Sequence, residues 1–140
     1  MLCFIVYYLG HYPEVKKRLW QEIDEIFGKD LTKPVTYKDL EELQYCEAII
    51  KEVYRIIPVA FLNSRVNVED DNVGGYNWPK GTIFQMLYSA IMKRKDYWTN
   101  PEKFDPDRFK YLLEKKKIKN TYSMFGGGII MYPGRKLAKN

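Results

Sequence analysis

The chain has 140 residues, of which 46% are hydrophobic and 16% aromatic, enough for one modest core. Its net charge is +5, and much of the basic excess lies in residues 115–119. That run predicts a solvated loop, with a docking patch for an acidic partner as the alternative. It is short and has no interleaved aromatics, so nucleic-acid binding is not predicted. Cys3, Cys46 and His11 have no metal or redox spacing, and each cysteine is expected to be a small buried residue.

Two helices are predicted at the start of the chain. Residues 1–10 are apolar but only about half as long as a bilayer-spanning helix, and no basic segment precedes them. They predict the end of a buried helix, with no transmembrane segment. A second helix begins at Pro13, which suits a first helical turn, and ends at Gly28. Its apolar stripe consists of Val15, Leu19, Ile23 and Ile26.

The next two helices carry the first charged pair of interest. Residues 36–39 form a capping box with Asp in place of Glu, which predicts a short helix. A longer helix follows at 45–57 and is stopped by Pro58. At helical spacing Glu52 flanks its apolar stripe and Arg55 points away from it, so the pair taken alone predicts a solvent-facing ion pair. The stripe is formed by Cys46, Ile49, Ile50, Val53, Ile56 and Ile57.

After Pro58 the pattern changes to short strands. Residues 65–68 and 82–86 predict two hairpin arms, with a polar turn at 69–72 between them. A helix is predicted at 87–95. Residues 100–109 carry three turn signals and predict an irregular segment.

The last stretch, 125–138, reads Phe-Gly-Gly-Gly-Ile-Ile-Met-Tyr-Pro-Gly-Arg-Lys-Leu-Ala. Three consecutive glycines predict a backbone that approaches something flat or bulky. Neither the phosphate-binding loop pattern nor the dinucleotide glycine pattern fits this spacing. The stretch resembles the haem loop of the cytochromes P450, which are haem-thiolate monooxygenases. Ile130 stands where that family has an arginine, and Tyr132 stands where it has the cysteine that holds the iron.

Three further segments match the family in order and spacing. The run from Glu52 to Arg55 resembles the family's Glu-x-x-Arg motif. Residues 104–109 resemble the segment whose arginine, Arg108 here, completes an ion-pair lock with that Glu and Arg. Arg65 matches a position whose arginine binds a haem propionate in many members of the family. The resemblance implies that Glu52, Arg55 and Arg108 are buried and structural, which reverses the prediction from helical spacing alone.

The implied fold class is mainly α with short β-hairpins, an α+β arrangement. Residues 1–140 are expected to form one partial cytochrome P450 domain, from the end of the I helix through the J and K helices, small sheet, meander and haem loop to the start of the L helix. The implied cofactor is haem, contacted by Arg65, Phe125, Gly128 and Tyr132. Tyr132 takes the axial position; a tyrosinate there would need a nearby arginine, and Arg135 is the candidate. The alternative is that Tyr132 marks the loss of the iron ligand and does not bind the metal.

Three functions remain open. In the first, this chain is part of a haem-dependent monooxygenase. The chain alone is then not expected to be catalytically competent, because the thiolate and the oxygen-activating helix are absent. The second is a non-catalytic remnant that binds a protein, for example a flavoprotein reductase through the basic face. The third is an unrelated module. The resemblance also implies a small apolar substrate for the full-length family, whose members are often anchored at the endoplasmic reticulum; no anchor is predicted here.

Overall fold

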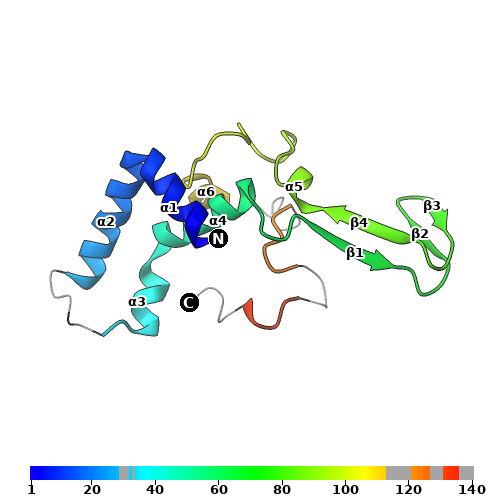
Figure 1. Ribbon diagram of the computed structural model, residues 1–140, viewed down its shortest axis with the longest axis horizontal. Coiled ribbons are helices and arrows are strands. Elements are labelled where there is room, and N and C mark those ends of the chain that lie inside the picture. Colours follow the sequence, from blue (N-terminus) through cyan, green and yellow to red (C-terminus); the bar gives the residue numbers. More distant parts are fainter. Residues whose placement is uncertain (29–31, 33, 113–120, 127–130, 136–140) are drawn as a thin grey trace.

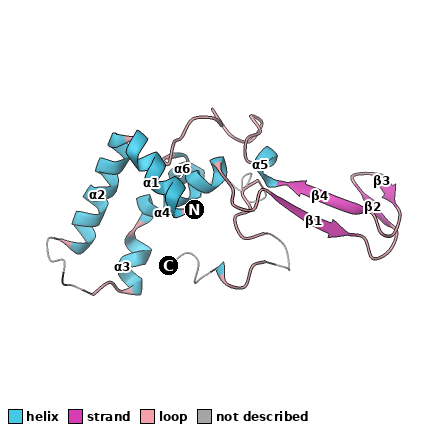
Figure 2. Cartoon of the chain, viewed as in Figure 1, coloured by secondary structure: helices cyan, strands magenta, loops and turns pink. Residues whose placement is uncertain are grey.

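The computed structural model describes residues 1–28, 32, 34–112, 121–126 and 131–135. The longer helices gather at one end of the molecule, and a β-ribbon extends from them to the other end (Figures 1 and 2). In chain order the described elements are α1 (Leu2–His11), α2 (Pro13–Phe27), α3 (Tyr37–Glu42), α4 (Gln44–Ile56), β1 (Leu62–Val66), β2 (Asp71–Val73), β3 (Tyr76–Trp78), β4 (Ile83–Leu87), α5 (Tyr88–Ile91) and α6 (Arg108–Leu112). A small α+β chain with short antiparallel strands is confirmed.

The boundaries of α2 and α3 follow their local sequence. Pro13 occupies the first turn of α2, and Gly28 ends the helix with a positive φ of 67°. At α3 the Thr36 hydroxyl accepts a hydrogen bond from the Asp39 N–H, and the Asp39 carboxylate accepts one from the Thr36 N–H. The predicted capping box is therefore confirmed.

Helix α4 lies at the centre of the helical end and contacts α1, α2 and α6. Because neighbours cover it on several sides, its buried residues do not follow the predicted stripe: Cys46 is only half-buried, whereas Tyr45, Ala48 and Tyr54 are buried. The main core cluster joins this helix to α2 and to the segment before α6. Its buried members are Val15, Tyr45, Ile49, Val53 and Phe104.

The β-structure consists of two separate antiparallel pairs. Strand β1 pairs with β4, with Leu62 opposite Leu87, and β2 pairs with β3. The prediction of a turn at 69–72 is wrong at its end, because Asp71 and Asn72 belong to β2. Asn72 donates a side-chain hydrogen bond across the pair to Asn77, and the chain turns instead at Gly74 and Gly75, which both have positive φ.

Two other expectations are corrected. The helix predicted at 87–95 is only α5, and turns follow it. In α1 no residue is buried: its Tyr8 side packs on the core, but Leu2 is 76% and Val6 69% exposed, so the predicted buried helix has one open face. Cys3 on the same helix is exposed, so it is not the buried residue predicted. Among the described residues, every helix is too short or too polar to span a bilayer.

Candidate functional site

Glu52 on α4 is the centre of a buried cluster of charges. Arg55, one turn later on the same helix, donates from Nε to Glu52 Oε2 at 2.8 Å and from Nη2 to Oε1 at 2.9 Å. Arg108, at the start of α6, donates from Nε to Oε1 at 2.9 Å, and the Asp105 N–H donates to the same oxygen at 3.0 Å. The side chains of Glu52 and Arg55 are fully buried and that of Arg108 is 8% exposed. The solvent-facing pair predicted from helical spacing alone is therefore wrong.

The remaining N–H groups of the two arginines bind backbone carbonyls of the segment between α5 and α6. Arg55 Nη1 donates to Met92 O at 3.0 Å, and Arg108 donates to Thr99 O at 2.8 Å and to Lys103 O at 3.0 Å. The Arg55 guanidinium also lies 5.4 Å from the centre of the Trp98 ring. Each charge is thus paired and hydrogen-bonded, which is the condition for burying it. The cluster fastens an irregular segment to α4.

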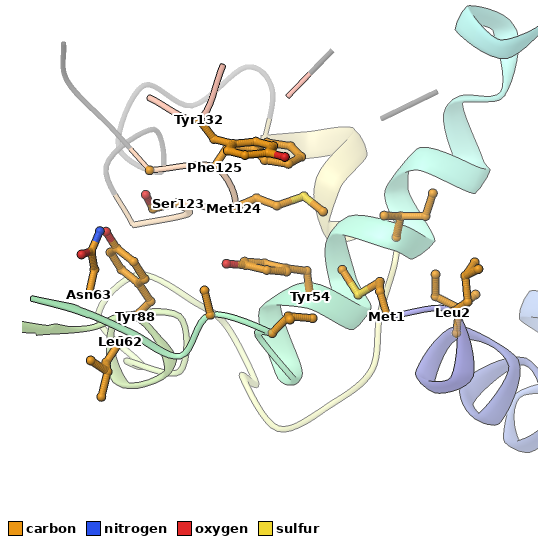
Figure 3. Close-up of a pocket in the computed structure, with 15 residues that line it drawn as sticks. Met1, Leu2, Tyr54, Leu62, Asn63, Tyr88, Ser123, Met124, Phe125 and Tyr132 are labelled. Carbon is orange, nitrogen blue, oxygen red and sulfur yellow. The ribbon is translucent and has the colours of Figure 1, made fainter. Parts of the chain in front are cut away.

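A cavity of about 890 Å³ lies between α1, α4, the start of β1, and residues 123–126 and 132 (Figure 3). Most of its wall is apolar, which suits a large flat hydrophobic molecule. Described residues that line it are Met1, Leu2, Ile5, Ile50, Tyr54, Val59, Ala60, Leu62, Asn63, Tyr88, Ser123, Met124, Phe125, Gly126 and Tyr132.

Phe125 and Tyr132 form one wall of the cavity. Their rings are stacked with centres 6.1 Å apart and planes 13° apart, and the Tyr132 N–H donates to Phe125 O at 2.9 Å. The Tyr132 ring also lies against Gly134, where an added Cβ would be 2.9 Å from it. Glycine at 134 therefore gives the tyrosine ring room to fold back over its own loop.

The structure places Arg65 close to the cavity but not in its wall. Arg65 is exposed on β1, and its Nη1 donates to Asn63 Oδ1 at 3.0 Å and to Ser64 O at 3.2 Å. Asn63 does line the cavity, so its hydrogen bond holds the Arg65 guanidinium at the rim of the cavity. The predicted haem contact Gly128, the substituted Ile130 and the basic run 115–119 lie outside the described residues.

The described cavity wall is mostly apolar, as the face of a haem macrocycle requires, but it offers no thiolate for an iron. Its described lining residues contain no cysteine or histidine; the donors are hydroxyls, an amide and the thioethers of Met1 and Met124. In the described part of the chain no three His, Cys, Asp or Glu residues are grouped as metal ligands. Tyr132, which the resemblance puts at the position of the iron ligand, lines the cavity with a phenol.

Sequence reasoning missed two residues that shape this region. Glu22 on α2 accepts hydrogen bonds from the N–H groups of Tyr45 and Cys46 at 2.6 and 2.9 Å, and so caps the start of α4. Tyr54 lines the cavity with a phenol that is buried. The local sequence pattern does not show that α2 contacts α4, so it gave no signal for Glu22. Tyr54 could have been found from the sequence, because it lies between Glu52 and Arg55 on a buried helix.

Comparison with known proteins identifies the family of this chain. The family model described as Cytochrome P450 matches residues 1–140. The chain is 41% identical over 133 residues to human Cytochrome P450 4V2, covering 95% of this chain and 25% of that protein. It is 35% identical over 127 residues to mouse Thromboxane-A synthase, covering 91% and 24% of the two chains. The chain thus spans about a quarter of the length of these relatives, and it belongs to the cytochrome P450 family.

Proposed function

We propose that this chain forms part of the haem pocket of a cytochrome P450 and does not itself carry out thiolate-dependent monooxygenation. Cytochromes P450 are haem monooxygenases that use redox partners and small substrates. In this proposal α2 and α4 correspond to the J and K helices and residues 100–109 to the meander. The ion-pair cluster of Glu52, Arg55 and Arg108 acts as a lock that holds the meander beneath the loop.

One observation carries the proposal: Tyr132, which stands in the sequence where the family has its cysteine, lines the cavity with its ring stacked on Phe125 and folded over Gly134. Bound haem supplies oxygen activation, and a thiolate ligand favours cleavage of the O–O bond. Phe125 and Tyr132 would contact one face of the macrocycle, and Arg65 would bind a propionate from the rim. Gly128 is assigned to the same loop by resemblance. Since no described lining residue offers sulfur as a thiolate, the chemistry that depends on it is not expected.

Contact with a flavoprotein reductase through the basic run at 115–119 remains a secondary proposal. Its support is the local excess of lysine, which suits an acidic protein surface.

The test is a haem titration followed by a carbon monoxide difference spectrum of the reduced protein. The unchanged chain is expected to give no thiolate-type band. Tyr132→Cys combined with Ile130→Arg is expected to give one, without monooxygenase turnover, because one ligand supplies only part of a catalytic site. Tyr132→Phe is the matched control: it keeps the stacked ring and removes the phenol oxygen, so an altered haem spectrum would reveal tyrosinate ligation. A thiolate-type band from the unchanged chain would overturn the proposal.

A further inference from the structure

One face of the β1–β4 ribbon is apolar although it is open to solvent. In the antiparallel register, opposite residues share a face, so Leu62 and Leu87 form one cross-strand pair of this face, and Val66 and Ile83 form another. The leucines are 36% and 47% exposed, Val66 is 58% exposed and Ile83 is 64% exposed. The solvated face of an antiparallel ribbon is usually polar, so these aliphatic pairs indicate a surface that a partner covers.

This apolar face lies on the side of the ribbon away from Asn63. Figure 3 shows the side chains of Leu62 and Asn63 on opposite sides of β1. The ribbon also extends beyond the helices (Figure 1), and each member of the two aliphatic pairs is exposed. The face is therefore accessible to another macromolecule.

The pattern of the apolar face is the same when it is read from either end. Between the leucine pair and the pair of Val66 and Ile83 lies a polar pair, Ser64 and Gln85, and both of these residues are exposed. A two-fold axis over the centre of this polar pair brings the leucines of one chain over Val66 and Ile83 of a second copy. It also sets each polar residue opposite its own counterpart, and a glutamine amide can both donate to and accept from another. This self-complementarity is what a symmetric dimer interface requires.

Charge and area are consistent with a second copy as the partner. Each chain carries a net charge of +5, so two copies repel one another, but no side chain of the apolar face is charged. Stacking this face on itself therefore buries no unpaired charge. At these exposed fractions the face offers about 500 Å² per chain and about 1,000 Å² for a pair, the lower limit for a specific interface. The dimer is expected to be weak and to depend on concentration.

We propose that the β1–β4 ribbon is a homodimer interface, in which the apolar faces of two copies stack in antiparallel orientation about a two-fold axis. Sheets that stack in this way lie about 10 Å apart, so the contact is made by side chains and needs no new strand pairing. The inference does not depend on haem. A thiolate-type band from haem-loaded protein would overturn the proposed function and leave the dimer result standing.

The test is sedimentation equilibrium of the unchanged chain at a series of micromolar concentrations, where a monomer–dimer equilibrium is expected. Ile83→Lys should weaken dimerisation by at least about tenfold, because it sets an unpaired charge against Leu87 of the second copy. Leu87→Glu should have the same effect. Val35→Lys is the matched control, since Val35 is 60% exposed and precedes α3, and it should leave the equilibrium unchanged.

The double variant, Ile83→Lys with Leu87→Glu, tests the orientation of the two copies. In the proposed dimer each new lysine meets the new glutamate of the second copy, so dimerisation should recover most of the loss. Within one chain the two positions are about 13 Å apart along β4, too far to pair with each other. Circular dichroism checks that each variant is folded.

Three results would each overturn the inference. They are a monomer at every concentration, dimerisation that is unaffected by Ile83→Lys, and a double variant that dimerises no better than the single variants. The second result would place the contact on another surface, such as the open face of α1.

Discussion

At the scale of single residues, Glu52 shows how this chain buries charge without a large penalty. One of its carboxylate oxygens accepts from Arg55, Arg108 and the Asp105 N–H, and the other accepts from Arg55. Two guanidinium groups around one carboxylate leave a net positive cluster, and the backbone carbonyls of Met92, Thr99 and Lys103 complete its hydrogen bonding. Removal of one partner therefore leaves both a charge and several carbonyls without donors.

Arg108→Ala is expected to lower the free energy of unfolding by more than about 2 kcal/mol, since it leaves a buried network incomplete. The measurement is urea unfolding followed by circular dichroism. Arg94→Ala is the control: Arg94 pairs with Asp96 on the surface, and its removal should have no measurable effect. A change within about half a kcal/mol for Arg108→Ala would mean that the three-way cluster does not hold residues 100–109 on α4.

At the scale of elements, α4 depends on a cap supplied by another helix. Its N-cap residue, Leu43, makes no side-chain cap hydrogen bond, yet two N–H groups of the first turn bind the carboxylate of Glu22 on α2. A carboxylate at this end also interacts favourably with the helix dipole. The contact ties α2 to the helix that carries Glu52, Arg55 and Tyr54.

Glu22→Ala is expected to cost about 1–2 kcal/mol, the range of a lost N-cap with a dipole contribution. Glu25→Ala serves as the control, because Glu25 is exposed on the same helix. Thermal unfolding of both variants, with helix content followed at the start of α4 by amide hydrogen exchange, measures the effect. Equal stability of the two variants would show that the cap contributes nothing.

At the scale of the whole molecule, several tyrosines make the folded state sensitive to high pH. Burial raises the pKa of Tyr122 well above its usual range and also raises the pKa of Tyr45 and Tyr54. An unfolded tyrosine titrates near pH 10, so above that pH the unfolded chain loses protons that the folded chain keeps. Stability is then fully present below about pH 10 and falls as the pH rises further.

Above that pH, the free energy of unfolding is expected to fall by about 1.4 kcal/mol per pH unit for each tyrosine that the folded chain keeps protonated. Urea unfolding from pH 8 to 11 measures it. Tyr122→Phe and Tyr54→Phe should each reduce this slope by the contribution of one proton. At neutral pH they should differ, because only Tyr122→Phe loses a hydrogen bond, to Lys51 O, at a cost of about 1 kcal/mol. A slope unchanged in both variants would contradict the assignment.

The sequence alone determined the features that depend on local chemistry. Pro13, Gly28 and the Thr36–Asp39 box set helix ends through backbone geometry and nearby hydrogen bonds, and these are confirmed. The family followed from ordered motifs. Within the haem loop, the substitution of the thiolate position by Tyr132 was visible from the residue itself.

Only the tertiary structure decided which charges and faces are buried. Helical spacing placed Arg55 toward solvent, because that pattern assumes a helix covered on one side; α4 is covered on several, and partners distant in sequence neutralise its charges. Tertiary packing also decided two other features: Glu22 caps α4 at Tyr45, 23 residues later in the chain, and the apolar face of α1 lies open. That the Tyr54 hydroxyl is buried with no hydrogen-bond partner among the described residues could likewise be seen only in the fold, because burial and pairing depend on neighbouring residues.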